Sequence, residues 1–398
     1  MSNPISTDEA RARLLAAAVP VNEHETIAAD AGLGRVLAAD IVSPVAVPPL
    51  DNSAMDGYAL RLADWQAGAS LKVGQRIPAG QLGRPLAPGE AARIFTGAAI
   101  PPGADAVVMQ EDCSVEDDRV QVRRQPRLGD NIRRAGEDVA VGQTVLAAGT
   151  RLGPGQLGVA ASVGAAQLRV FRRLRVATFF TGDELVAPGQ ALPPGRIYNS
   201  NRASLRGLIG QIGCELIDLG QVPDRLDATV AVLETARDRA DVILTSGGVS
   251  VGEEDHVKAA VERLGRIDLW KVAMKPGKPL VYGRVGAADF IGLPGNPVSA
   301  FVVFCLFARP FLLKRMGAEL APPAAFSVPA AFTWTKPGQR REFLRARLEN
   351  GAAALYPSQS SGVLTSVAWA DGLVDLDIGV TVAPGDPVRF LPFAELLK

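Results

Sequence analysis

The 398-residue sequence predicts a multidomain protein of the α/β plus β class, in which a doubly wound α/β unit lies between two β-rich units. A chain of this length forms roughly two to four domains. A Pro- and Gly-rich stretch with short β-like runs extends from Val45 to Asp138, and from about Leu174 apolar strand-like runs alternate with amphipathic helical runs. Strand-like runs return after Met316.

The chain is expected to begin with a short helix and then to enter the first β-rich unit. Ser6 and Glu9 have capping-box spacing before the run ARARLLAAA, which Pro20 ends. Between Val45 and Asp138 the runs AVVMQ and VQVRR resemble strands, and no long helical period occurs. These features predict an inserted β domain.

The central unit should contain a mostly parallel sheet covered by helices. The runs RVATFF, CELIDLG and DVILTSGG read as strands, and RASLRGLIGQIG and DATVAVLETARDRA as helices. Ligands of such sheets bind at the carboxyl ends of the strands, so these ends are where chemistry is expected.

The last unit is predicted to be a small β barrel or sandwich. AELAPPAAFSVPAAF is Ala- and Pro-rich and reads as a linker. REFLRARLE, GVLTSVAWADG and DPVRFLPF come after it as strand-like runs with turn residues.

Composition excludes several classes of function. Lys plus Arg and Asp plus Glu both number 42, which gives no support for general attraction to nucleic acid or to an anionic membrane. Cys113, Cys214 and Cys305 lie far apart without a CxxC pair, which argues against a disulfide framework or a zinc site. With only His24 and His256, any metal must be held by carboxylates.

A cytoplasmic location without a membrane partner is expected. The N-terminal residues lack the charged start and apolar core of a secretory signal. The longest apolar run, Val298 to Ala308, is too short to span a bilayer, and Arg309 and Pro310 prevent its extension.

Two short motifs suggest functions that their surroundings do not support. Gly248 to Gly252 fits the G-x-S-x-G elbow of serine hydrolases, with Ser250 as nucleophile, but only His256 lies beyond it and Asp255 directly precedes that histidine. Gly153 to Gly158 matches G-x-G-x-x-G without a βαβ unit and a ribose-binding acid. Its proline more simply marks a helix start.

The stretch from Thr245 to Asp255 is more informative as an anion and metal site. Glycines after a strand let backbone N–H groups converge on an oxyanion, and Glu253, Glu254 and Asp255 offer ligands for Mg²⁺. A structural turn with solvated acids is the alternative interpretation.

Two further loops suit an anion. In WKVAMKPGKP the Pro-Gly turn should gather Lys271, Lys275 and Lys278 into one loop, although a solvated basic loop is equally compatible with the pattern. Pro294 to Pro297 turns into an apolar helix whose free N-terminal amides could seat an anion, or it is simply a helix start.

These loops belong to one α/β unit, and TGDEL adds Asp183 and Glu184 after another strand. Oxyanion donors beside carboxylates indicate a metal-assisted phosphoryl-transfer or phosphoanhydride-cleavage site.

The motifs as a set resemble a known family. PPLDNSAMDGYA, RIFTGAAIPPGADAVVMQE, NIRRAGEDV, TGDEL, IYNSNR, TSGGVSVGEEDHVK, KPGKP and LPGNPVSA occur in the order and spacing of molybdopterin molybdenumtransferase, the MoeA family related to the E domain of gephyrin. The resemblance runs from near the N-terminus to the C-terminal β unit. It implies a discontinuous N-terminal and linker domain (1–46 and 139–173), an inserted β domain (47–138), a doubly wound molybdopterin-binding domain (174–320) and a C-terminal β barrel (325–398).

The resemblance also implies a reaction. The family inserts molybdate into adenylated molybdopterin with a divalent cation, usually Mg²⁺, and releases AMP and the molybdenum cofactor. It implies a homodimer with its active site between subunits, and transient contact with a separate molybdopterin adenylyltransferase. A non-catalytic molybdopterin-binding scaffold is the alternative, and tungstate instead of molybdate is another, since the two anions have equal charge and similar size.

Position by position, the resemblance assigns site residues in three groups. The catalytic residues are Asp56, Thr96, Asp138, Glu184, Asp224 and Asp255, of which Asp255, Glu184 and Asp224 are metal ligands. The substrate-binding residues are Ser246, Gly247, Gly248, Ser250, Lys271, Lys275, Lys278, Pro294, Pro297, Arg345 and Ser361.

Two positions depart from the family pattern. Asn199 stands in IYNSNR where an aspartate is usual, and Asp224 is followed by Arg225 where two acids are common. Asn199 can still donate and accept hydrogen bonds but supplies no charge, so metal affinity or substrate preference could differ.

Overall fold

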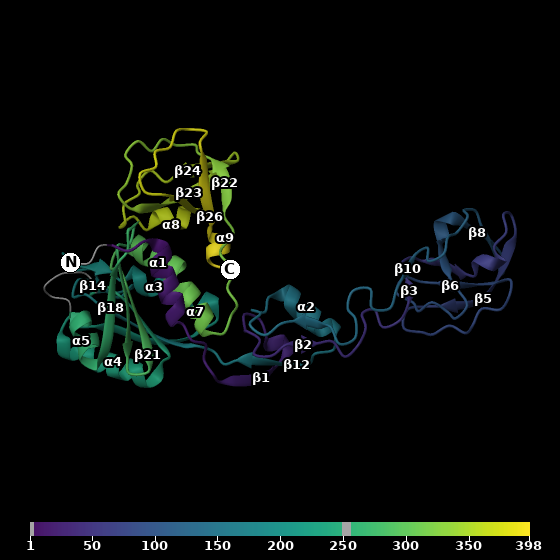
Figure 1. Cartoon of the computed structure of the whole chain (residues 1–398), viewed down its shortest axis with the longest axis horizontal. Coiled ribbons are helices and arrows are strands. Elements are labelled where there is room, and N and C mark those ends of the chain that lie inside the picture. Colours follow the sequence, from purple (N-terminus) through teal and green to yellow (C-terminus); the bar gives the residue numbers. More distant parts are fainter. Residues whose placement is uncertain (1–3, 249–255) are drawn as a thin grey trace.

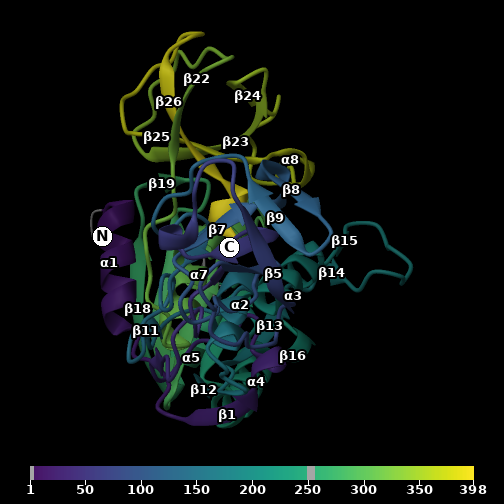
Figure 2. The same cartoon turned by 90° about the vertical axis from the view of Figure 1, so that its right-hand side faces the viewer.

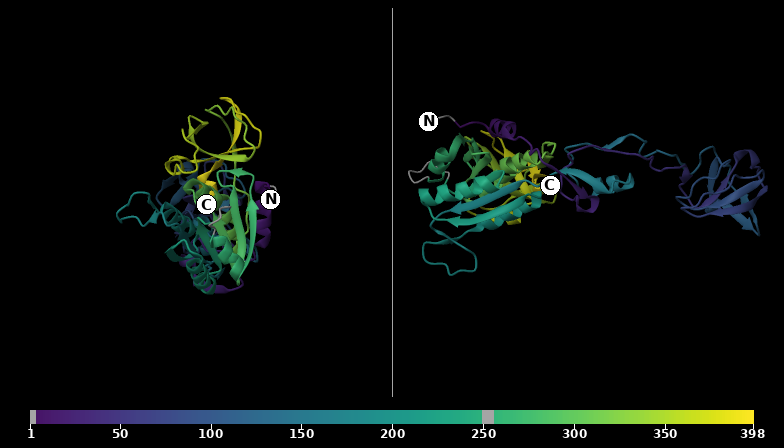
Figure 3. Two further views of the ribbon diagram at one scale, coloured as in Figure 1. Left: turned by 90° about the vertical axis from the view of Figure 1, so that its left-hand side faces the viewer. Right: turned by 90° about the horizontal axis from the view of Figure 1, so that it is seen from below.

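The computed structural model describes residues 4–248 and 256–398. A body holds the α/β unit and the C-terminal sheet, and a narrow arm carries a separate β sheet at its far end (Figures 1 and 3). The sheets have the predicted character, a mostly parallel one in the body and two β-rich units around it, which confirms the predicted fold class. The exact domain bounds stay predictions.

The predicted N-terminal helix is present as α1 (Thr7–Ala17). Ser6 caps it, because the Glu9 N–H donates to Ser6 Oγ at 3.1 Å. Ala10 and Leu14 bury the inner face of α1 in the main core of the body.

The arm is built from two distant segments of the chain. Strand β1 (His24–Ala28) pairs with β12 (Gln167–Phe171), and β2 (Ile41–Val42) pairs with β11 (Thr144–Leu146), both antiparallel. The remaining elements of this unit are a 3-10 turn, η1 (Ala29–Ala31), and helix α2 (Pro154–Ser162), which begins at Pro154 as predicted. These pairings produce the predicted discontinuous unit.

The inserted sheet at the end of the arm has six strands in the order β7-β4-β6-β5-β9-β8. Its two faces bury separate small apolar clusters around Leu60 and Ile77. A two-stranded ribbon, β3 with β10, joins it to the arm. The elements are β3 (Asn52–Ser53), β4 (Gly57–Leu60), η2 (Leu62–Asp64), β5 (Ser70–Ile77), β6 (Glu90–Ile94), β7 (Ala106–Met109), η3 (Gln110–Asp112), β8 (Cys113–Glu116), β9 (Arg119–Val122) and β10 (Ile132–Arg133).

The body contains a six-stranded sheet in the order β16-β13-β17-β21-β20-β18. Its first four strands are parallel, and β20 and β18 extend it antiparallel. The carboxyl ends of the parallel strands therefore meet at one edge. The elements are β13 (Arg175–Thr181), β14 (Leu185–Val186), β15 (Ile197–Tyr198), α3 (Ser200–Ile212), β16 (Glu215–Val222), α4 (Leu226–Arg239), β17 (Val242–Ser246), α5 (His256–Leu264), β18 (Gly265–Lys271), β19 (Met274–Lys275), β20 (Pro279–Val285) and β21 (Ala288–Leu293).

One long apolar helical segment comes after β21. Helix α6 (Pro297–Val303) runs through a π-helical stretch, η4 (Phe304–Ala308), into α7 (Arg309–Arg315). The 19-residue segment Pro297–Arg315 is long and apolar enough to cross a membrane by length and composition, so the expectation that Arg309 and Pro310 end the apolar run was wrong. The π stretch lets the helix pass Pro310 without breaking. Because 72% of its apolar stretch is buried inside the protein, we interpret the segment as a core helix of the body.

The C-terminal unit is a strongly curved sheet that forms an open ring above the body (Figure 2). Its strand order is β19-β23-β25-β26-β22, with β24 paired to β23. Strand β19 comes from the body, so the KPGKP segment is hydrogen-bonded into this sheet. The elements are β22 (Phe326–Pro329), β23 (Arg341–Glu349), β24 (Ala352–Leu355), α8 (Thr365–Trp369), β25 (Gly372–Leu376), β26 (Pro387–Pro392) and α9 (Phe393–Leu396).

Candidate functional site

A cavity of about 700 Å³ lies at the carboxyl ends of the parallel strands, where the body meets a loop of the C-terminal sheet. Seven separate segments of the chain contribute to its wall. The lining residues are Thr181, Gly182, Glu184, Asp224, Gly247, Gly248, Lys275, Pro276, Gly277, Lys278, Pro279, Pro294, Gly295, Asn296, Ser299, Arg340, Gln359, Ser360 and Ser361.

Two predicted carboxylates, Glu184 and Asp224, share this wall. Glu184 turns back over Gly182, whose φ of 145° and missing Cβ make room for it, since a Cβ there would lie 2.7 Å from Glu184 Oε2. Asp224 is held near the same loop, because its N–H donates to Asp183 Oδ1 at 3.4 Å. The loops after β13 and β16 thus bring both acids to one place.

The glycines after β17 line the cavity and have left-handed backbone conformations, with φ of 98° at Gly247 and 62° at Gly248. Ser246, the last residue of β17, is buried. Its hydroxyl donates to the Pro294 carbonyl at 2.9 Å and accepts from Asn201 Nδ2 at 2.8 Å. Ser246 therefore ties this loop to the Pro294 turn, behind the cavity wall.

Two of the three predicted lysines, Lys275 and Lys278, line the cavity, whereas Lys271 does not. The turn between them needs glycine, because Gly277 has a φ of 100° and a Cβ there would lie 2.4 Å from Val303 Cγ2. Lys275 Nζ lies 3.5 Å from Glu342 Oε2, so its charge is partly balanced. Lys278 forms no ion pair among the described residues, so its charge is more available to a bound anion.

The Pro294 turn contributes Pro294, but Pro297 is the first residue of α6 and does not line the cavity. The amide of Val298 is already occupied, since it donates to the Ser361 carbonyl at 3.1 Å. The C-terminal loop therefore covers part of the helix start that was expected to seat an anion. Ser361 itself lines the cavity, as predicted.

Arg345 was predicted to contact an oxyanion, but it lies behind the cavity wall. It is 0% exposed, and its guanidinium donates to Ser366 Oγ, the Phe343 carbonyl and the Ser360 carbonyl at 3.1 to 3.3 Å. Burial lowers the pKa of this guanidinium to about 10. Arg345 thus supports the loop that lines the cavity.

The arginine on the cavity wall is Arg340, which the sequence-based assignment missed. It precedes β23, and its Nη1 donates to the Met274 carbonyl at 3.3 Å, next to the lysine turn. The run RREFLR offers three arginines, and the signal that separates them is their place relative to the strand. Arg341 binds Asp375 and Arg345 points into the sheet core, which leaves the residue before the strand.

Asp56, Thr96 and Asp138 lie outside this cavity. Asp56 Oδ1 accepts from the Thr96 N–H at 2.7 Å and from Thr96 Oγ1 at 2.8 Å, and these hydrogen bonds lower the pKa of Asp56. The pair belongs to the inserted sheet at the far end of the arm (Figure 1), whereas exposed Asp138 lies between β10 and β11, where its N–H donates to the Val47 carbonyl at 3.0 Å. Within one chain these residues do not meet the cavity.

The departure at Asn199 is accommodated as a helix cap. Asn199 is buried, and its Oδ1 accepts from the Arg202 N–H at 3.0 Å at the start of α3. An uncharged side chain performs this role, so the asparagine is consistent with an intact fold at the edge of the site.

The predicted residues Ser250 and Asp255 lie outside the described residues, as do Glu253 and Glu254. Among residues 4–248 and 256–398, no group of three or more His, Cys, Asp or Glu side chains is placed to hold a metal. Glu184 and Asp224 are the predicted metal ligands that this part of the chain brings to the cavity.

The fold and cavity are those of a multidomain α/β enzyme with carboxylates and basic groups converging at the carboxyl ends of parallel strands. Family models match in three consecutive parts: the MoeA N-terminal region (domain I and II) over residues 5–164, a probable molybdopterin binding domain over 177–314, and the MoeA C-terminal region (domain IV) over 327–393.

Whole-chain relatives agree with these matches. The molybdopterin molybdenumtransferase of Haemophilus influenzae is 42% identical over 86% of this chain and 85% of its own length. Molybdopterin molybdenumtransferase 2 of Mycobacterium tuberculosis is 40% identical over 89% and 92%. A solved structure of the molybdopterin biosynthesis MoeA protein from Pyrococcus horikoshii covers 98% of this chain and 100% of its own, with a TM-score of 0.85 and 29% identity.

The chain belongs to the molybdopterin molybdenumtransferase family, also called MoeA. It is therefore a transferase of molybdenum cofactor biosynthesis.

Proposed function

We propose that the protein replaces the adenylyl group of adenylated molybdopterin by molybdate, with Mg²⁺, and releases AMP. The observation that carries the proposal is the convergence of Glu184 and Asp224 with Lys275, Lys278 and Arg340 in one cavity. Such a set can bind a phosphoanhydride and a second oxyanion side by side.

The basic side chains and the glycine loop have separate tasks in this proposal. Lys278 and the backbone amide at Gly248 hold phosphate oxygens, whereas the Gly247 N–H donates to the Leu293 carbonyl at 3.3 Å. Arg340 and Lys275, with Ser361 beside them, receive the tetrahedral molybdate dianion on the side of the C-terminal loop. Placing both anions in one cavity brings the incoming metal oxyanion to the pterin that loses AMP.

The carboxylates fit a magnesium ion. Mg²⁺ prefers oxygen ligands and is commonly bound by one or two carboxylates plus substrate phosphates, which matches Glu184 and Asp224 beside a phosphate site. When bound, the ion would offset negative charge on the anhydride oxygens. Asp255 is proposed as a third carboxylate, although it lies outside the described residues.

The assigned residues that lie far from the cavity suggest that the active form is a homodimer. Asp56, Thr96 and Asp138 lie on or near the inserted sheet, away from the cavity of their own chain (Figure 1). We propose that the arm of a second copy brings the Asp56 and Thr96 pair to the cavity. Transient contact with the adenylyltransferase that supplies the substrate, and action in the cytoplasm, complete the proposal.

The test is AMP release from adenylated molybdopterin by the purified protein, with Mg²⁺ and with or without micromolar molybdate. Release that depends on both molybdate and Mg²⁺ is the expected result. Tight pterin binding without AMP release under any of these conditions would instead identify a non-catalytic scaffold.

A further inference from the structure

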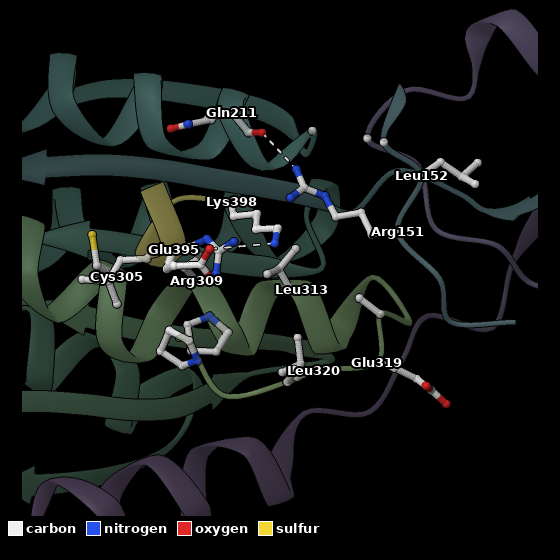
Figure 4. Close-up of a pocket in the computed structure, with 18 of the residues that line it drawn as sticks. Arg151, Leu152, Gln211, Cys305, Arg309, Leu313, Glu319, Leu320, Glu395 and Lys398 are labelled. Atoms are coloured by element: carbon white, nitrogen blue, oxygen red, sulfur yellow. Dashed lines mark hydrogen bonds and ion pairs between the residues drawn. The ribbon is translucent and has the colours of Figure 1, made fainter. Parts of the chain in front are cut away.

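A second cavity, of about 710 Å³, lies where the arm, the body and the C-terminal tail meet. Its walls come from α1, from the start of α2, from the end of α3, from the segment spanning η4 and α7, from the linker 318–323, and from residues 395–398. Figure 4 shows the side chains of Arg151, Arg309 and Lys398 pointing toward the same space. None of the residues assigned to the transferase site lines it.

The charges around this cavity are unbalanced. Five basic side chains line it against two carboxylates, and the nearest acid-base pair, Lys398 with Glu395, is loose at 3.9 Å. The basic residues are Arg11, Arg151, Arg173, Arg309 and Lys398, and the acids are Glu319 and Glu395.

Among residues 4–248 and 256–398, none of the four arginines that line the cavity forms an ion pair with a carboxylate, and two of them also have a buried Nε atom without a partner. In the part of the chain that the structure describes, the Arg309 guanidinium forms no ion pair, and its Nε has no hydrogen-bond partner. Arg151 donates to the Gln211 and Ile212 carbonyls, both at 3.2 Å, and to no other acceptor among the described residues. The Nε atoms of both arginines are buried and unpaired among these residues.

This arrangement is electrostatically unfavourable as it stands. Burial and the positive charge of Arg151 lower the pKa of Arg309, and the nearby Glu395 carboxylate opposes this shift only in part. Burial also lowers the pKa of Arg151. An anion between the two guanidiniums would offset both the lost hydration and the repulsion between like charges.

The apolar part of the cavity wall suits an organic group attached to that anion. Leu152, Leu306, Leu313, Leu320 and Pro310 line the cavity beside the basic groups. The volume lies in the range of small-molecule sites, and apolar walls with a few convergent polar groups are typical of them.

We propose that this cavity is a second anion site, which binds a small phosphomonoester dianion between Arg151 of the arm and Arg309 of the body. A phosphomonoester carries close to two negative charges at neutral pH and several acceptor oxygens, which matches two facing guanidiniums. The bound dianion bridges the arm and the body where the two join.

The test is calorimetric titration with inorganic phosphate and with phenyl phosphate, on a K275Q/K278Q background that weakens binding in the first cavity. The proposal expects one site on this background, with phenyl phosphate binding more tightly than phosphate because its ring contacts the leucine wall. R151Q and R309Q should each weaken binding by roughly tenfold or more.

A variant that is expected to tighten phosphate binding separates an effect on binding from a loss of folding. E395Q removes a carboxylate from the cavity and should tighten phosphate binding severalfold, whereas R13Q, on the exposed Arg13 that pairs with Glu9, should leave it unchanged. Absence of phosphate binding by the folded background protein overturns the proposal. Equal affinity in R151Q, R309Q and E395Q overturns it as well.

Discussion

Arg340 and Arg345 show how residues close in the sequence acquire different roles through their depth in the fold. Arg345 is fully buried with three hydrogen-bonded acceptors, and Arg340 faces the cavity. R345M should lower the free energy of unfolding by about 2–4 kcal/mol, because it leaves buried acceptors unpaired. R340M should leave stability nearly unchanged and raise the molybdate concentration needed for half-maximal AMP release by about tenfold. Urea unfolding and a molybdate titration of both variants check this, and the reverse pattern would contradict it.

Glu184 provides a test of the metal assignment. E184Q keeps the size of the side chain but removes the charge, so the Mg²⁺ concentration for half-maximal activity should rise by about tenfold. E116Q is a matched control, because Glu116 is exposed on β8 in the inserted sheet. An unchanged Mg²⁺ requirement in E184Q would remove Glu184 from the ligand set.

At the residue scale, the family resemblance assigned Glu184, Asp224, Lys275, Lys278 and Ser361 to the site, and the structure brings these residues to one cavity. It could not separate Arg340 from Arg345 or exclude Lys271. The reason is physical: these positions depend on how β19 pairs with β23, a contact between segments far apart in the chain.

At the scale of elements, local sequence signals predicted helices and strands correctly where one physical cause, such as a helix cap or a buried apolar run, determines the structure. The Ser6 cap of α1, Pro154 at the start of α2 and the body strands β13, β16 and β17 formed as predicted. The run GVLTSVAWADG was read as a strand but contains α8, followed by β25. Short apolar runs do not distinguish helix from strand by periodicity, and Ser366, buried here against Arg345, is set by a long-range contact.

The Asn199 cap separates a structural role from a charged role. N199A should destabilise the protein by about 1 kcal/mol, because the Arg202 N–H loses its acceptor. N199D should keep that stability, since aspartate caps helices as well as asparagine does. A large loss of stability in N199D, measured by chemical unfolding, would contradict the assignment of Asn199 as a cap.

Asp241 should make the stability of the body depend on acid. It accepts hydrogen bonds from Arg172 and Arg175 at the start of the sheet, which hold its pKa well below the ordinary value of 3.8 in spite of its burial. This stabilisation is therefore complete above the unfolded pKa and is lost as pH falls from about 5 through the lower folded pKa. D241N should unfold more easily by about 2–4 kcal/mol at pH 7 and show a weaker loss of stability in acid. Unfolding curves from pH 7 to 3 check both effects, and parallel pH profiles would contradict them.

At the scale of the whole molecule, the sequence predicted the classes of the units but not their spacing. Nothing local in the sequence sets the length of the arm, which results from pairing β1 with β12 and β2 with β11. That pairing places the inserted sheet, next to which Asp56 lies, far from the body that carries Glu184 (Figure 1).

This separation predicts complementation between subunits. D56A and K278Q proteins should each be nearly inactive alone, since Lys278 lies in the same cavity as Glu184. Mixed and refolded together, they should recover up to about a quarter of wild-type activity, because random pairing makes half of the dimers mixed and each such dimer has one intact site. No recovery, with mixed dimers demonstrated by mass spectrometry, would place Asp56 at a site of its own chain.

The most direct test of the proposed reaction is single-turnover AMP release from adenylated molybdopterin by the wild-type protein and by K278Q, at saturating Mg²⁺ with and without molybdate. Lys278 lies on the wall of the proposed site and forms no ion pair among the described residues. Wild-type release should depend on molybdate, and K278Q should release AMP about a hundredfold more slowly, as expected when a charged contact to the reacting phosphate is lost. Wild-type rates in folded K278Q would show that the reaction takes place elsewhere.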